Sequence, residues 1–154
     1  MPRLTECLQT DHRRLDAILV ECKAQAAAGR FAAAADRFTT FREGLARHID
    51  AEEDVLFPAL AQHTPHARGP VSVMRSEHVQ IREWMATLAR ALAAADPAWS
   101  SVMGELEEVL SGHNAKEEHV LYPMADEATH EARELDVLRA TLQGMIEARA
   151  RQGA

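Results

Sequence analysis

The sequence predicts an all-α protein, an up-down-up-down four-helix bundle with an additional C-terminal helix. Aromatic residues make up only 5% of the 154 residues, while alanine, which favours helices and disfavours strands, is very frequent. Apolar residues recur at helical spacing along four stretches of about 24 to 30 residues, and short loop-like segments separate these stretches. Four such helices joined by short loops are typical of an antiparallel bundle.

The first two helices are predicted from this periodicity and from the glycine between them. The first covers about residues 5–28, and Gly29 stands where glycine commonly ends a helix. The second covers about residues 32–62 and contains Pro58. Because a proline inside a helix removes one hydrogen bond and clashes with the carbonyl four residues back, we expect a kink or break there.

The remaining helices are also marked by their boundaries. Pro70 suits the first turn of a third helix that runs to about residue 95, and Asp96 and Pro97 suit the start of a fourth. The fourth ends the bundle at about residue 127 and contains Pro123, where we again expect a kink or break. An amphipathic stretch at about 131–149 predicts the C-terminal helix, which packs across the bundle or forms a homodimer with a second copy.

Composition limits the class of protein. Residues 1–154 are of a length that predicts one domain with a single core. A net charge of −7 disfavours nucleic-acid binding, no apolar run approaches the roughly 18 residues of a membrane span, and the first residues lack a signal-peptide pattern. Cys7 and Cys22 are roughly 22 Å apart on one predicted helix, too far for a disulfide. We therefore expect a cytoplasmic protein with reduced thiols.

An internal repeat places histidines and glutamates at matching positions in the two halves of the chain. A shift of 65 or 66 residues aligns His12 with His78, His48 with His113, Glu52 with Glu117, and Pro58 with Pro123. Each half thus contributes a lone histidine and then a His-x-x-x-Glu motif, followed by Leu-Phe-Pro or Leu-Tyr-Pro. Agreement at this many polar and proline positions indicates a true repeat.

The repeated polar residues stand among apolar ones. Because residues four apart share a helix face, the histidine and glutamate of each motif can point together into the bundle. Each of the four histidines is flanked at helical spacing by large apolar residues, drawn from leucine, isoleucine, methionine and phenylalanine. Four histidines and two carboxylates therefore occupy the middle of four core-facing stripes.

Such a group of polar residues needs a compensating interaction, because isolated charges are costly in a dry core. One alternative is a buried network in which the six groups hydrogen-bond one another. The doubled arrangement favours metal binding instead, and imidazole with carboxylate favours iron, manganese or zinc over calcium or magnesium. Two symmetric halves suit two ions, and a shared oxo or hydroxo group would leave about one open position per ion.

The order of these motifs, over about residues 8–125, resembles the hemerythrin-like (HHE cation-binding) domain family. The resemblance implies a non-haem di-iron centre with two bridging glutamates. Oxygen-carrying hemerythrins place a second histidine one turn after the lone histidine of the third helix, where this chain has Arg82. The set of four histidines and two glutamates is instead similar to the metal-binding set of iron–sulfur-centre repair proteins and of iron-sensing hemerythrin domains. The ligands that the resemblance implies are His12, His48, Glu52, His78, His113 and Glu117.

Several residues close to this set have open assignments. Glu53 and Glu118 adjoin implied ligands and would replace them if the helices were rotated. Arg82 aligns with Asp16 in the repeat, so either the two pair across the bundle or each is separately solvated. Tyr122 has the chemistry to donate a hydrogen bond close to the metal ligands, but lining the core is the favoured interpretation.

The first functional interpretation is a binding or sensing module whose two irons take up O₂, NO or a peroxide. A di-iron enzyme acting on peroxide or NO, or an iron donor in iron–sulfur cluster repair, is the second. Iron storage or a metal-stabilised scaffold is the third. Steady turnover would indicate an enzyme, and more than about two irons per chain would indicate storage. The sequence has no phosphate-binding loop, Cys-x-x-Cys pair or nucleophile elbow.

Overall fold

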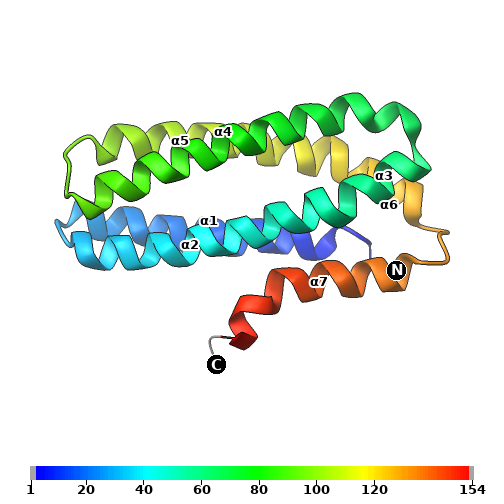
Figure 1. The fold of residues 1–154 in the computed structure, drawn as a ribbon, viewed down its shortest axis with the longest axis horizontal. Helices are drawn as coiled ribbons and strands as arrows, with labels where there is room; N and C mark the ends of the chain where they lie inside the picture. Colours follow the sequence, from blue (N-terminus) through cyan, green and yellow to red (C-terminus); the bar gives the residue numbers. More distant parts are fainter. Residues whose placement is uncertain (1–2, 153–154) are drawn as a thin grey trace.

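The computed structural model describes residues 3–152, and side chains within residues 3–147; the outermost residues of the predicted domain lie outside this range. Every regular element in the described part is helical. Four long antiparallel rods form a bundle in which α1 and α2 make one layer and α4 and α5 the other (Figure 1). The helices that begin these rods are α1 (Glu6–Ala27), α2 (Phe31–Ala51), α4 (Arg68–Ala93) and α5 (Trp99–Lys116). The predicted bundle is confirmed.

The second and fourth rods continue through their internal prolines by a change of helix type. A π-helical segment, η1 (Glu52–Leu56) or η3 (Glu117–Leu121), precedes α3 (Phe57–His63) or α6 (Tyr122–Thr129), and the proline is the second residue of the last helix. The N–H of Phe57 bonds to the carbonyl of Glu52, five residues back, and Tyr122 bonds to Glu117 likewise. Neither rod breaks at its proline: where a kink or break was predicted, the helix widens by about one residue per turn, which accommodates a residue without an N–H.

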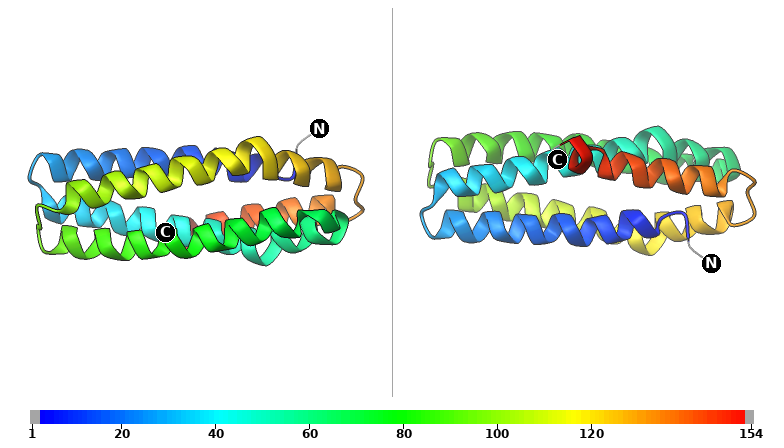
Figure 2. Two further views of the ribbon diagram at one scale, coloured as in Figure 1. Left: turned by 90° about the horizontal axis from the view of Figure 1, so that it is seen from above. Right: turned by 90° about the horizontal axis from the view of Figure 1, so that it is seen from below.

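The connections are short. Gly29 adopts a left-handed φ of 77° between α1 and α2, which is the helix stop predicted from the sequence. A single 3₁₀ turn, η2 (Pro65–Ala67), joins α3 to α4, so the third rod begins slightly before Pro70. The C-terminal helix α7 (Leu135–Gln152) begins later than predicted and packs across α1, α2 and η1 (Figure 2). Its Leu142 and Ile146 are buried.

The apolar core consists of two clusters with a polar layer between them. One cluster includes Leu15 of α1 and Leu110 of α5, and the other includes Leu8 of α1 and Leu121 of η3. On three rods the predicted site residues fall between the two clusters along the chain, and on the second rod His48 and Glu52 flank the point where Ile49 of one cluster is followed by Ala51 of the other. Apolar side chains therefore close the polar layer on both sides. No helix in the described range is long and apolar enough to cross a membrane.

Candidate metal centre

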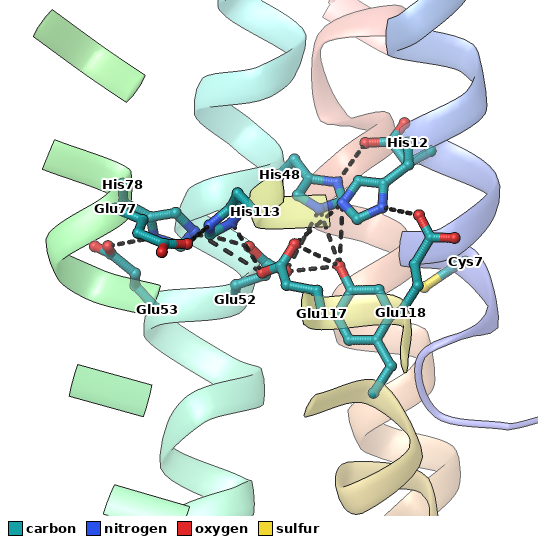
Figure 3. A network of polar contacts seen from close by, with 12 residues as sticks. Cys7, His12, His48, Glu52, Glu53, Glu77, His78, His113, Glu117 and Glu118 are labelled. Carbon is teal, nitrogen blue, oxygen red and sulfur yellow. Dashed lines mark hydrogen bonds and ion pairs between the residues drawn. The ribbon is translucent and has the colours of Figure 1, made fainter. Parts of the chain in front are cut away.

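The structure brings together all six side chains that the sequence singles out (Figure 3). Each is at most 4% exposed. Their donor atoms form two groups, and within each group all atoms lie within 4.8 Å of one another. The first group contains His12, His48, Glu52 and Glu117, and the second contains Glu52, His78, His113 and Glu117. Both glutamates therefore belong to both groups, and we call the whole arrangement the cage.

Each glutamate directs one oxygen into each group. In the first group, His12 Nε2 lies 3.2 Å from Glu117 Oε1, and His48 Nε2 lies 3.6 Å from Glu52 Oε2. In the second group, Glu52 Oε1 lies 3.1 Å from His78 Nε2, and Glu117 Oε2 lies 3.2 Å from the Nε2 of the remaining histidine, His113. Each carboxylate therefore has one oxygen available at each of two positions that could hold a cation.

Four further carboxylates surround the cage and fix its histidines. Each faces the outer ring nitrogen, Nδ1, of one histidine at 2.7 to 2.9 Å. An imidazole whose Nδ1–H is engaged in this way presents the lone pair of Nε2 to a metal ion. The pairs are His12 with Glu118, His48 with Asp11, His78 with Glu53, and His113 with Glu77.

We call these four carboxylates the outer ring. Glu53 and Glu118 belong to it, because each faces the outer nitrogen of a histidine and not the interior of the cage. Asp11 and Glu77 do the same for the other two histidines, a function that the sequence analysis missed. The repeat held the signal, because it aligns Asp11 with Glu77 as well as Glu53 with Glu118. The outer ring thus follows the same two-fold pattern as the cage.

The electrostatics of the cage attract positive charge. Burial alone would lower the pKa of His48, but the Glu52 carboxylate and the hydrogen bond to Asp11 raise it to about 10. Burial opposes protonation of His113 too, yet contacts with Glu117 raise its pKa to about 9. Glu117 Oε2 is buried and accepts no hydrogen bond. A cation between these groups would satisfy that oxygen and take the place of the protons, so the donor set fits a metal ion.

The ring of Tyr122 is part of the apolar core, and its hydroxyl group lies beside the donor atoms of the first group. Its hydroxyl donates a hydrogen bond of 2.6 Å to Glu52 Oε2. Burial and the carboxylates of Glu117 and Glu52 hold the pKa of Tyr122 well above its ordinary value, so the metal-free protein keeps the phenol protonated. The residue aligned with it in the repeat, Phe57, stacks on the ring of His78 at 5.8 Å between centroids.

Arg82 does not pair with Asp16, which was one of the two alternatives that the repeat left open. Arg82 instead lies 3.6 Å from Asp50 Oδ1 and 3.8 Å from Glu53 Oε1. The reason is the order of the rods, because α4 packs beside α2, which carries Asp50, and not beside α1, which carries Asp16. Arg82 therefore contacts the outer ring through Glu53.

The four remaining histidines of the chain lie outside the cage. His63 contacts Glu134 at 3.1 Å, and His66, His119 and His130 are exposed. Both cysteines are free, as expected from their spacing, and neither belongs to the two groups of donor atoms in the described range.

Comparisons with known proteins agree with this geometry. Residues 3–125 match the family model of the hemerythrin HHE cation binding domain. The iron-sulfur cluster repair protein YtfE of Escherichia coli (strain K12 / DH10B) is 32% identical over 97 residues. The protein of the same name from Shigella boydii serotype 18 (strain CDC 3083-94 / BS512) is equally similar. Each match covers 56% of this chain and 44% of the relative, so the chain matches less than half the length of these relatives. No solved structure matches the chain.

Proposed function

The chain belongs to the hemerythrin HHE cation-binding domain family, and we propose that it binds two iron ions joined by an oxo or hydroxo bridge. Manganese and zinc can bind the same imidazole and carboxylate donors. We propose iron because it is the metal that the resemblance to the family implies. We further propose that the whole chain, α7 included, forms one domain around this centre. The proposed ligands are His12, His48, Glu52, His78, His113 and Glu117, with the two glutamates bridging.

The observation that carries the proposal is the orientation of the four imidazoles. Each outer nitrogen is engaged with a carboxylate, so all four inner nitrogens converge on the same two glutamates. Without positive charge inside the cage, these lone pairs and carboxylate oxygens would repel one another. A buried network of neutral hydrogen bonds would instead need donors between them, and Glu117 Oε2 accepts no hydrogen bond of good geometry although His113 Nε2 lies 3.2 Å away.

We propose that the protein takes up or senses a small ligand, namely O₂, NO or a peroxide, at an open iron position. Bound iron would supply reversible one-electron chemistry and places for such a ligand. The chain itself contributes a dry surrounding, because apolar clusters close the polar layer on both sides. An apolar surrounding favours a small neutral ligand over a charged one.

Metal analysis with absorption spectroscopy tests the iron proposal. The iron-loaded protein should contain about two irons per chain and show the near-ultraviolet band of an oxo-bridged diferric centre. His48→Ala and His113→Ala should each lower the iron content, because each removes an inner nitrogen. His119→Ala, which changes an exposed histidine two residues after Glu117, is the matched control. Two irons per chain in both cage variants would overturn the ligand assignment.

Iron donation in iron–sulfur cluster repair is a second candidate function, favoured by the similarity to iron-sulfur cluster repair proteins. Iron-loaded protein mixed with a cluster-depleted iron–sulfur protein should then lose iron to it, and the acceptor should regain its cluster once sulfide is supplied. Stoichiometric binding of NO without transfer would support sensing. Steady consumption of H₂O₂ or NO would instead identify an enzyme.

A further inference from the structure

The two groups of the cage differ at one pair of aligned residues. The repeat matches histidine with histidine and glutamate with glutamate throughout the cage, but it matches Tyr122 with Phe57. Both rings are fully buried and both follow a bridging glutamate by five residues. Of these two aligned rings, only that of Tyr122 carries an oxygen, the phenol Oη, which adds a fifth possible donor atom to the first group.

This oxygen contacts the donor atoms of all four members of the first group. It lies 2.6 Å from Glu52 Oε2 and 3.3 Å from Glu117 Oε1. It also lies 3.3 Å from the Nε2 atoms of His12 and His48. A phenol has one proton, which it donates to Glu52, so its lone pairs face the remaining atoms. A neutral imidazole whose Nδ1–H is engaged directs its Nε2 lone pair at the phenol oxygen, so the two atoms attract one another only through a shared proton or metal ion.

The spacing of these atoms is that of ligands around one ion. Around an octahedral ion with bonds of about 2.1 Å, neighbouring donor atoms lie about 3 Å apart. The contacts of the phenol oxygen range from 2.6 to 3.3 Å, and the imidazole–carboxylate contacts of the same group are 3.2 and 3.6 Å. The phenol oxygen thus has the spacing of one more member of the donor set.

We propose that Tyr122 Oη is a ligand of the metal ion in the first group, and that the open place for a small ligand lies in the second group, beside Phe57. The inference rests on the proposed function, because it requires the cage to bind metal. Coordination forms a metal–oxygen bond and breaks the phenol O–H bond; the proton passes to solvent and no oxidation state changes. The two ions are then unequal although the histidines and glutamates are arranged symmetrically.

Tyr122 is the only tyrosine in the sequence, so a phenolate signal can be assigned to this residue without ambiguity. A phenolate bound to ferric iron gives a charge-transfer band in the visible and enhanced ring vibrations in resonance Raman spectra. The ferric protein should show both, and Tyr122→Phe should abolish both. Phe57→Tyr should strengthen them, and the double variant Phe57→Tyr with Tyr122→Phe, which has the composition of the original chain, should retain one phenolate.

Iron content separates failure of this inference from failure of the proposed function. A protein with two irons per chain and no phenolate signature would overturn the tyrosine assignment while leaving the iron centre intact. A protein that binds no iron would instead refute the proposed function. Loss of the tyrosine ligand should also weaken iron retention against a chelator at least about tenfold, since even indirect ligand support contributes that much.

Azide tests the location of the open place. Iron-loaded original protein and Tyr122→Phe should both bind azide, whereas Phe57→Tyr should lose azide binding because the new phenol oxygen fills the second group. Undiminished azide binding by Phe57→Tyr, at unchanged iron content and with a second phenolate, would place the small ligand elsewhere and overturn this part of the proposal.

Discussion

At the scale of single residues, the cage depends on carboxylates that do not enter it. Asp11 accepts a hydrogen bond from His48 and also from Arg14, at 2.8 Å, so its position is fixed from two sides. Its pKa is lowered despite burial, because the contacts with His48 and Arg14 favour the charged form. A charged partner at Nδ1 both orients the imidazole and makes Nε2 a stronger donor to metal.

Asp11→Asn should therefore weaken metal binding without disturbing the fold. We expect the affinity for iron to fall about 10- to 100-fold, the usual effect of removing such a partner, with an unchanged helical circular-dichroism spectrum. A competition titration with a chelator measures the affinity. Asp16→Asn removes the same charge from an exposed site on the same helix and should have little effect. Equal losses in both variants would mean that only net charge matters.

The raised pKa values of His48 and His113 predict a pH dependence of the metal-free protein. Protonation of the folded cage stabilises it fully below the unfolded pKa of about 6.5. This stabilisation is lost as the pH rises through about 9 for His113 and about 10 for His48. Chelator-treated protein should thus melt at a lower temperature at pH 10 than at pH 7. His113→Gln should lose less over this range, and an identical slope would contradict the assignment.

The six inner residues were predictable from the sequence, whereas the repeat that aligns the outer carboxylates with one another does not reveal which histidine each of them contacts. Four-residue spacing and apolar neighbours place His48 and Glu52 on one inward face, which is a property of any helix. Which nitrogen of an imidazole faces inward depends on contacts between rods, and so does the partner of Arg82. The phenol of Tyr122 illustrates the same limit, because apolar periodicity identifies a buried ring and not where its oxygen points.

At the scale of elements, the two π-helical segments place the glutamates. Each segment begins at a glutamate that belongs to both donor groups and ends just before the helix that contains the proline. The helix boundaries were predicted to within about four residues, and the prolines marked both irregular places. The type of irregularity was not predictable, because a break, a kink and a wider turn all relieve the missing N–H.

Helix α7 packs against one of these segments, η1. Loss of a buried side chain of α7 should therefore lower the stability of the fold. Leu142 is fully buried in the cluster that also contains Leu56 of η1. Leu142→Ala should lower the free energy of unfolding by about 2–5 kcal/mol, because it deletes buried methyl groups and leaves a cavity. Urea denaturation followed by circular dichroism measures this change. Val137→Ala, at a position 66% exposed on the same helix, should cost far less; comparable losses would argue against packing of α7 through Leu142.

At the scale of the whole molecule, the repeat forms two hairpins that share one centre. The first hairpin supplies His12 and His48, the second supplies His78 and His113, and each contributes one glutamate to both groups. Neither hairpin alone contains a complete group. The sequence predicts this sharing only in outline, because a repeat shows that two halves are alike and not that their carboxylates cross between positions.

Metal loading should stabilise the entire fold, since ions that bind only the folded chain shift the unfolding equilibrium. Free metal at about 100 times the dissociation constant contributes about 2.7 kcal/mol, which for this chain length corresponds to about 5–10 °C in Tm. Calorimetry of iron-loaded and chelator-treated protein measures the difference. The double variant His48→Ala with His113→Ala should show almost none, and an equal gain in that variant would locate the stabilising metal outside the cage.

The sharing of Glu52 and Glu117 has one more consequence. A single short covalent connection, residues 64–67, joins the two hairpins along the chain. A cation held by both carboxylates is a second tether across the interior, and unlike the peptide chain it can be fastened and released. Binding of the ion would thus add a releasable link between the hairpins, and loss of the ion would leave them joined by the peptide connection and by their packing and hydrogen bonds.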